Sequence, residues 1–267
     1  MMRWIRAASA VLAAGLLLCG GTAMAREKVG VLLMHGKKGT AEHVQSLATD
    51  LIGAGYLVVT PDMPWSQSRA YERTLEDAHG EIDGWIASLR QDGATRIVVA
   101  GHSMGATMAM GYAATHTGVD GVVALGPGQL ADMPSFRERL KDSVVRARSM
   151  IAAGRGDATT SFSDLHLGKQ STTDTTARIY ASYFDPEGLA ALASVAPRVS
   201  VPVLWTVGTA DQTLMDLGRG YAFDRLQATP FNGYVQVASD HMGTPDASRA
   251  AVLSWLRLVF GAPDRSS

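Results

Sequence analysis

The stretch Arg96 to Gly105 reads RIVVAGHSMG, and it carries most of the information about the fold. Its first half, Arg96 to Ala100, is short, apolar and β-branched, as in a strand buried within a sheet. Its second half matches G-x-S-x-G and opens into the helical pattern Met104 to His116. This order pushes the serine hydroxyl out at the carboxyl end of the strand, and the two glycines allow a close backbone approach. The alternative is a glycine-rich turn that only packs, so the interpretation of Ser103 as a nucleophile depends on the rest of the chain.

Apolar runs of the same kind alternate with helical patterns elsewhere in the chain. The runs are Val29 to Met34, Tyr56 to Thr60, Gly121 to Leu125, Val201 to Val207 and Tyr234 to Ala238. The helical patterns are Thr40 to Ile52, Ser68 to Arg90 and Thr244 to Phe260. Short apolar runs without strict alternation fit strands that are covered on both faces. We therefore expect an α/β fold, a doubly wound and mostly parallel sheet with helices on both faces.

The interval 127–196 breaks this rhythm, because it contains no convincing strand pattern. Ser135 and Glu138 have the spacing of a capping box for a helix that ends near Ala153. The polar stretch Ser171 to Thr176 is expected to be a loop, and a further helix is expected from Asp185 to about Val195. The interval is interpreted as a small helical cap over one end of the sheet, and the alternative is a longer ordinary crossover.

A serine at its ordinary pKa is a poor nucleophile, so Ser103 needs a base and an acidic residue that orients the base. His241 directly follows the run that ends at Ala238, and Asp211 follows the run that ends at Val207. The carboxyl ends of parallel strands share one edge of a sheet, where α/β active sites lie. Ser103, Asp211 and His241 are therefore the expected catalytic residues. Asp216 is the nearest competitor for the acidic role, and Asp240 is the alternative for a local hydrogen bond near the histidine.

An acyl-transfer enzyme also needs two donors for the oxyanion. Met104 directly follows the serine and offers one backbone N–H. The second donor is expected from the loop 35–39, HGKKG, where Gly36 permits a sharp turn and the N–H of Lys37 would face Ser103. The lysine side chains of this loop are expected to be solvated.

These features resemble the α/β-hydrolase superfamily over nearly the whole chain, from about residue 29 to 260. The resemblance rests on Met34-His35-Gly36, on the motif at 101–105, on Asp211 and on His241. It implies an acylatable serine, a histidine base, an orienting aspartate and a cap after the sixth strand of that fold. The GHSMG form is common among esterases, simple lipases and thioesterases, and HGK resembles the oxyanion type with a single glycine.

Two residues are further candidates for the substrate pocket. The segment Thr60 to Trp65 resembles the turn after the fourth strand of the superfamily, so Trp65 either lines the acyl pocket or packs the turn. His102 is the variable residue of the motif, directly beside Ser103. The apolar residues between 130 and 160 either form a lid over an acyl pocket or are the inward face of a helix.

The N-terminus has the pattern of a secretory signal peptide. Two arginines within the first six residues precede an almost wholly apolar run from Ala7 to Cys19, and Ala23-Met24-Ala25 offers small residues for cleavage. The run is short for a membrane-spanning helix, and Leu18 disfavours a lipoprotein anchored through Cys19. We therefore expect cleavage after Ala25, a hydrolase domain of residues 26–267 without a stable membrane span, and a periplasmic or secreted location.

The 267 residues carry 24 Lys and Arg against 25 Asp and Glu, so no general attraction to nucleic acid or to an acidic membrane is expected. One cysteine excludes an internal disulfide and a cysteine-cluster zinc site. The sequence favours an exported serine hydrolase that cleaves carboxylic esters of a small-molecule acyl substrate, with no metal and no organic cofactor. A thioesterase, an amidase or a peptidase would use the same residues, and a non-catalytic binding protein with this fold is the third hypothesis. The oligomeric state is not predicted.

Overall fold

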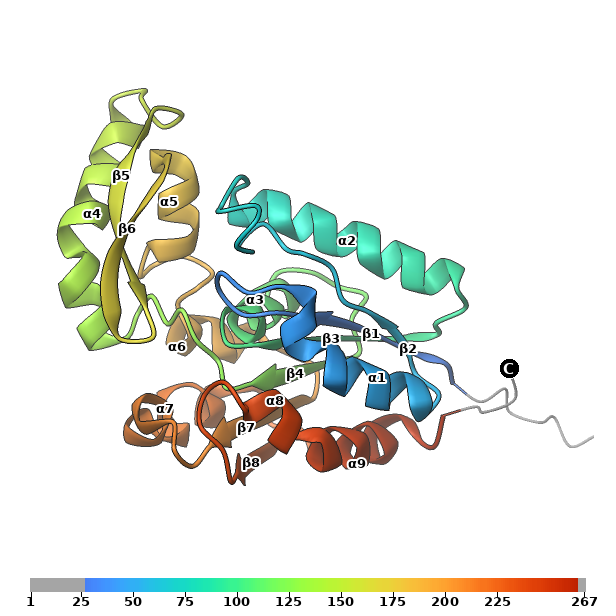
Figure 1. Ribbon diagram of the computed structural model, residues 1–267. Coiled ribbons are helices and arrows are strands. Elements are labelled where there is room, and N and C mark those ends of the chain that lie inside the picture. The colour runs from blue at the N-terminus through green and yellow to red at the C-terminus, as the bar shows by residue number, and fades with distance from the viewer. Residues whose placement is uncertain (1–26, 264–267) are drawn as a thin grey trace, which may run out of the picture.

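The computed structural model describes residues 27–263. The expected signal peptide and its cleavage site after Ala25 lie outside these residues. In the range that is described, no helix is both long enough and apolar enough to cross a membrane. The chain forms one central sheet with helices on both faces, and an inserted unit stands beyond one edge of that sheet (Figure 1).

Six parallel strands form the sheet, in the order β2-β1-β3-β4-β7-β8. Their bounds are β1 (Val29–Met34), β2 (Leu57–Val59), β3 (Arg96–His102), β4 (Gly121–Leu125), β7 (Val203–Gly208) and β8 (Gly233–Val237). Each strand lies within two residues of an apolar run identified in the sequence, and the predicted α/β class is confirmed. Because the strands are parallel, their carboxyl ends meet at one edge, and this edge carries the site described below.

Helices cover both faces of the sheet and explain why the strand sequences are apolar throughout. α1 (Gln45–Gly53) and α9 (Arg249–Phe260) lie on one face, and α2 (Leu75–Gln91) and α3 (Met104–Ala113) lie on the other (Figure 1). Successive strand residues point to opposite faces. In β1, Leu32 packs into the cluster that includes α2 and α3, and Val31 packs into the cluster that includes α1 and α9.

Several helix boundaries differ from those expected. α2 begins at Leu75 and not at Ser68, because the side chain of Thr74 caps it by accepting a hydrogen bond from the N–H of Asp77. The last helical pattern is divided at Ser248 into α8 (Thr244–Ala247) and α9. Short elements occupy the loops of the sheet. They are the 3-10 turns η1 (Ala41–Val44), η3 (Arg219–Tyr221) and η4 (Phe223–Arg225), and α7 (Gln212–Leu217).

The interval between β4 and β7 folds into a unit that contains a β-hairpin as well as helices. Its elements are α4 (Pro134–Ala152), β5 (Thr159–His166), β6 (Lys169–Thr176), α5 (Ala177–Phe184), α6 (Leu192–Val195) and η2 (Ala196–Arg198). α4, the hairpin and α5 stand together beyond the carboxyl ends of the strands (Figure 1). We call residues 127–196 the inserted unit.

Three expectations for the inserted unit are wrong. The stretch Ser171 to Thr176 is not a loop, because it pairs with β5 as the antiparallel strand β6. Most of β6 faces solvent, so it lacks apolar alternation and depends on the strand preference of its threonines. The helix expected from Asp185 begins only at Leu192, as the single turn α6, although it ends at Val195 as expected. The helix expected to end near Ala153 is present as α4, but it begins at Pro134 with Met133 as its N-cap and not at the expected capping box.

Candidate active site

Ser103 stands on the sharp turn between β3 and α3. Its backbone has φ 53°, a value that is strained for a residue with a side chain and costs on the order of 1–3 kcal/mol. The flanking glycines make the turn possible. A Cβ on Gly101 would lie 2.3 Å from the carbonyl carbon of Gly105, and a Cβ on Gly105 would lie 2.6 Å from the carbonyl oxygen of Met34. Both glycines of G-x-S-x-G are therefore required by the backbone itself.

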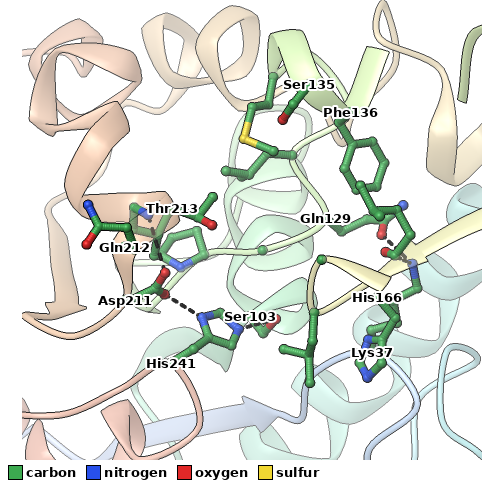
Figure 2. Close-up of a pocket in the computed structure, with 18 of the residues that line it drawn as sticks. Lys37, Ser103, Gln129, Ser135, Phe136, His166, Asp211, Gln212, Thr213 and His241 are labelled. Carbon is green, nitrogen blue, oxygen red and sulfur yellow. Dashed lines mark hydrogen bonds and ion pairs between the residues drawn. The ribbon is translucent and has the colours of Figure 1, made fainter. Parts of the chain in front are cut away.

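Three side chains from separate strand ends form a hydrogen-bonded chain at this edge (Figure 2). The Oγ of Ser103 lies 2.9 Å from Nε2 of His241, and Nδ1 of His241 lies 2.6 Å from Oδ2 of Asp211. Asp211 directly follows β7, and His241 follows β8. A nucleophile, a base and an orienting carboxylate in this order have the geometry needed to activate a serine.

The carboxylate of Asp211 is held in its charged form. Burial alone raises the pKa of Asp211, but the hydrogen bond and charge of His241 and the N–H of Leu214 outweigh it and lower the pKa. Oδ1 of Asp211 accepts the Leu214 N–H at 3.3 Å, so the same side chain caps α7. A charged Oδ2 fixes a proton on Nδ1 of His241, which leaves Nε2 free to accept the proton of the serine.

The two rival aspartates have other partners. Asp216 accepts a hydrogen bond from the side chain of Gln212 at 2.5 Å, and Asp240 accepts one from the N–H of Gly243 at 2.8 Å. Asp211 is the carboxylate that contacts His241 in the described part of the chain.

His102 lies next to His241 and is nearly fully buried. Its Nε2 lies 2.9 Å from the carbonyl oxygen of His241, and because a carbonyl only accepts, this nitrogen carries the proton. Burial, and then the neighbouring His241, lower the pKa of His102 to about 4. A neutral His102 therefore holds the backbone of His241 and also lines the smaller cavity described below.

The residues expected to supply the oxyanion donors, Lys37 and Met104, are neighbours of Gly36 and of Ser103 in the chain. Gly36 packs directly against Ser103, since a Cβ on Gly36 would lie 3.1 Å from the serine Cβ. The loop is fixed by hydrogen bonds from the Lys38 N–H to the Trp65 carbonyl at 2.8 Å and from the Gly39 N–H to the Gly36 carbonyl at 3.0 Å. Among residues 27–263 the N–H of Lys37 has no acceptor, and neither does the N–H of Met104.

The side chain of Lys37 is not solvated, contrary to expectation, and is only 8% exposed. Its Nζ forms an ion pair with Asp164, which has no exposed surface, and donates to Oε1 of Gln129 at 2.8 Å. Burial lowers the pKa of Lys37 to about 8, against the opposing attraction of Asp164. Burial raises the pKa of Asp164, but the charges of Lys37 and Lys38 outweigh it and lower the pKa.

Trp65 lies away from the cavities and packs the loop instead. Its indole is fully buried, and Nε1 donates to the carbonyl oxygen of His35 at 2.9 Å. Nε2 of His35 in turn accepts the N–H of Met63 at 3.0 Å. Of the two alternatives for Trp65, its position matches packing of the turn and not lining of a pocket.

Two cavities meet at Ser103. The larger has a volume of about 470 Å³ and runs between the inserted unit and α7. Its wall includes the apolar side chains of Leu130, Met133, Phe136, Leu165 and Leu214. The smaller, of about 90 Å³, lies toward Gly36, Gly39, His43 and His102. His166, Leu167 and Met242 line both cavities, so the tip of the β5–β6 hairpin lies over the junction between them.

Gly128 was not identified from the sequence, although it lies against the nucleophile. A Cβ on Gly128 would lie 2.4 Å from Oγ of Ser103. The carbonyl oxygen of Gly128 accepts a hydrogen bond from the hydroxyl of Thr107 on α3, which fixes the loop there. The sequence does contain an indication of this loop, because glycines at 126 and 128 directly follow a strand. A glycine pair of this kind is also common in ordinary turns.

Within residues 27–263 no group of three or more His, Cys, Asp or Glu side chains is arranged to hold a metal ion. Around Ser103 the structure brings together the hydroxyl, the imidazole of His241 and the carboxylate of Asp211 in one chain of hydrogen bonds.

The fold and this site define an α/β-hydrolase. Residues 25–235 match the family model described as serine aminopeptidase, S33, so the chain belongs to this hydrolase family. No curated protein matches the chain.

Solved structures of lipolytic enzymes share the fold. A monoacylglycerol lipase from Paleococcus ferrophilus is 24% identical with a TM-score of 0.62, over 86% of this chain and 96% of that one. A structure from the study of LipS and LipT, two metagenome-derived lipolytic enzymes, is 17% identical with a TM-score of 0.63, over 87% and 95%. A thioesterase domain from the curacin biosynthetic pathway is 19% identical with a TM-score of 0.54, over 86% and 91%. At these identities the likeness extends to the fold alone.

Proposed function

We propose that the protein is an exported serine hydrolase that cleaves carboxylic esters through Ser103, His241 and Asp211. The observation that carries the proposal is the unbroken chain of hydrogen bonds from Oγ of Ser103 through His241 to the buried carboxylate of Asp211. Among the described residues, the N–H groups of Lys37 and Met104 have no acceptor; Lys37 follows Gly36, which packs against Ser103, and Met104 directly follows Ser103, so both are candidates for the other requirement of acyl transfer.

The reaction begins when Oγ of Ser103 attacks the ester carbonyl carbon and Nε2 of His241 takes the hydroxyl proton. The carbonyl oxygen becomes an oxyanion, which accepts hydrogen bonds from the N–H groups of Lys37 and Met104. Asp211 stabilises the imidazolium of His241. The imidazolium then donates its proton to the departing alkoxide, and an alcohol leaves. Water, deprotonated by His241, attacks the acyl-enzyme, and the proton returns to Ser103 as the acid leaves.

The larger cavity supports an ester with an apolar portion as the substrate. Its apolar wall and its volume of about 470 Å³ suit a small-molecule ligand, and it opens directly onto the nucleophile. The likeness of the fold to lipolytic enzymes is consistent with such a substrate. Thioester and amide bonds are cleaved by the same sequence of steps, so the preferred bond has to be determined with matched substrates.

A panel of matched substrates tests the proposal. We expect p-nitrophenyl esters to be hydrolysed faster than the thioester or the p-nitroanilide with the same acyl group. Activity on esters is expected to peak beyond acetate as the chain is lengthened toward palmitate, because the cavity wall is apolar. A higher kcat/KM for the matched thioester or anilide would overturn ester hydrolysis, and an optimum on acetate would argue against an apolar acyl site.

Export is proposed from the sequence of the N-terminus, which carries the charged, apolar and small-residue regions of a signal peptide. Expression of the full chain in a Gram-negative bacterium, followed by fractionation and N-terminal sequencing, tests it. A periplasmic or secreted protein that begins at Arg26 is expected, and an uncut protein in the cytoplasm would contradict the proposal.

The variant Gly128→Ala is expected to lower kcat by about 10- to 100-fold. The added Cβ would lie 2.4 Å from Oγ of Ser103, so the hydroxyl has to rotate away from His241 or the loop has to move. Steady-state kinetics on the best ester, with urea unfolding in parallel, measures the effect. Gly80→Ala is the matched control, because a Cβ there would have no neighbour within 4 Å. Unchanged kcat in Gly128→Ala would contradict the geometry.

A further inference from the structure

The side chain of Lys37 joins the loop after β1 to the inserted unit (Figure 2). Its Nζ donates to Oδ1 of Asp164, to Oε1 of Gln129 at 2.8 Å and to the carbonyl oxygen of Leu165 at 2.9 Å. It also lies 5.0 Å from the centre of the Phe184 ring. These partners come from the first loop of the inserted unit, from β5 and from the end of α5. A single side chain thus contacts three separate segments of that unit.

The backbone of the same residue lies beside the nucleophile. Gly36 is packed against Ser103, and the following N–H, that of Lys37, has no acceptor among the described residues. The Lys37 side chain and its N–H share one Cα, so a movement of the loop that released Nζ from the inserted unit would also move the N–H. The position of the Lys37 N–H, an expected oxyanion donor, therefore depends on the contacts that the Lys37 side chain makes with the inserted unit.

The same Nζ also contacts the loop at residues 128–129, which lies against Ser103. Gln129, one of its acceptors, has φ 56°, an uncommon conformation for a residue with a side chain. The preceding residue, Gly128, lies against Oγ of Ser103. The side-chain amide of Gln129 donates to the carbonyl oxygen of Tyr183 at 3.3 Å, which leaves its Oε1 for Lys37.

The two members of the Lys37–Asp164 pair affect the stability of the fold in opposite directions. The pKa of Lys37 in the folded protein, about 8, lies below the ordinary value of 10.5 because the ammonium is buried. A folded-state pKa below the unfolded one means that the charged lysine opposes folding at neutral pH, and that this cost is relieved as the pH rises from about 8 toward 10.5. The lowered pKa of Asp164 acts in the opposite direction, because its charged form favours folding at neutral pH. Buried ion pairs are often replaced by apolar residues without loss of stability. Because such a pair adds little net stability, we look for its role in the contacts that Nζ makes with three segments of the inserted unit.

We propose that Lys37 is a positioning residue, whose side-chain contacts with Asp164, Gln129 and Leu165 make assembly of the oxyanion site depend on docking of the inserted unit. This inference rests on the proposed acyl transfer at Ser103. Lys37 acts through its own N–H, and its ammonium does not touch the substrate, because its donors are directed to the inserted unit.

Two variants distinguish a role of Lys37 in positioning its N–H from a role in neutralising the buried charge of Asp164. Lys37→Met keeps the backbone N–H and removes the anchor, while Lys38 stays paired with Asp164 at 3.2 Å. The double variant Lys37→Met/Asp164→Leu removes both buried charges, so no unpaired carboxylate remains in the core. Arg148→Met is the control, since it removes ion pairs to Asp185 and Glu187 within the inserted unit, away from the loop.

The measurements are kcat and KM on the best ester, the Ki of an aliphatic trifluoromethyl ketone, and urea unfolding. The ketone adds to the serine and places an oxyanion in the site. Both Lys37 variants are expected to lose about 10- to 100-fold in kcat and a similar factor in ketone affinity. KM is expected to stay within about threefold of the wild-type value, since ground-state binding is retained. The double variant is expected to be at least as stable as the wild type, and Arg148→Met to match the wild type in kcat and Ki.

Recovery of wild-type kcat in the double variant would overturn the inference, because Lys37 would then only balance the charge of Asp164. Unchanged ketone affinity in both Lys37 variants would overturn it as well. If the wild-type protein neither turned over an ester nor bound the ketone, the proposed function itself would fail, and this inference with it. If the wild-type protein hydrolysed the ester and bound the ketone, and the Lys37 variants had the same kcat and Ki, only this inference would fail and the proposed function would stand.

Discussion

Replacement of Ser103 by alanine is expected to lower kcat on the best ester by about 10⁴- to 10⁶-fold. Oγ of Ser103 is the atom that Nε2 of His241 contacts, at 2.9 Å, so it is the atom placed to form the acyl-enzyme. Residual activity would come from water held near the oxyanion donors. The fold is expected to be retained, since alanine needs no more room than serine and the strained turn is held by the flanking glycines.

An active-site fluorophosphonate measures this directly. The wild-type protein is expected to gain the mass of one phosphonyl group on Ser103, and Ser103→Ala is expected to gain none. Equal labelling of the two proteins would place the nucleophile elsewhere. A Ser103→Ala protein with the circular dichroism and urea midpoint of the wild type shows that lost activity is not lost folding.

The variant Asp211→Asn is expected to lower kcat by about 10³- to 10⁴-fold. Asp211 accepts a hydrogen bond from the Nδ1–H of His241 at 2.6 Å, whereas an asparagine can turn its NH₂ toward the ring. The proton of the imidazole then moves to Nε2, where it faces Ser103, and the histidine no longer accepts the serine proton. Stability is expected to change little, because an asparagine oxygen still accepts the N–H of Leu214 and caps α7.

The control for this variant is Asp216→Asn. Asp216 is exposed, lies on α7 and contacts Gln212 instead of His241. Its kcat is expected to equal that of the wild type. If Asp216→Asn lost as much activity as Asp211→Asn, the orienting role of Asp211 would be wrong, and the common effect would reflect displacement of α7.

The sheet was predictable because its strands are buried on both faces. A strand such as Val29–Met34 has to be apolar throughout, and this leaves a strong signal in the sequence. The site residues Ser103, Asp211 and His241 were identified for a related reason, since each follows such a strand and parallel strands end at one edge.

The inserted unit was less predictable because its structure depends on contacts that are distant in the sequence. β6 is polar and is a strand only because β5 pairs with it. The side chain of Lys37 is buried because residues far along the chain meet it, among them Asp164, 127 residues later. A lysine next to a glycine in a loop is ordinarily solvated, so its local sequence gives no sign of its partner. Gly128 likewise gains its importance from proximity to Ser103 and not from its neighbours in the chain.

The turn at Leu167 and Gly168 forms the tip of the β5–β6 hairpin, where mutations can change substrate preference among related proteins. Leu167 is 58% exposed, lines both cavities and adopts φ 48° in a two-residue turn. A glycine or asparagine there would relieve the backbone strain. Mutations at this tip leave the sheet and the catalytic residues untouched, so they carry little risk of unfolding while they reshape the junction above Ser103. Natural variation can therefore change the range of accepted substrates at the tip of the hairpin, where a mutation disturbs the fold least.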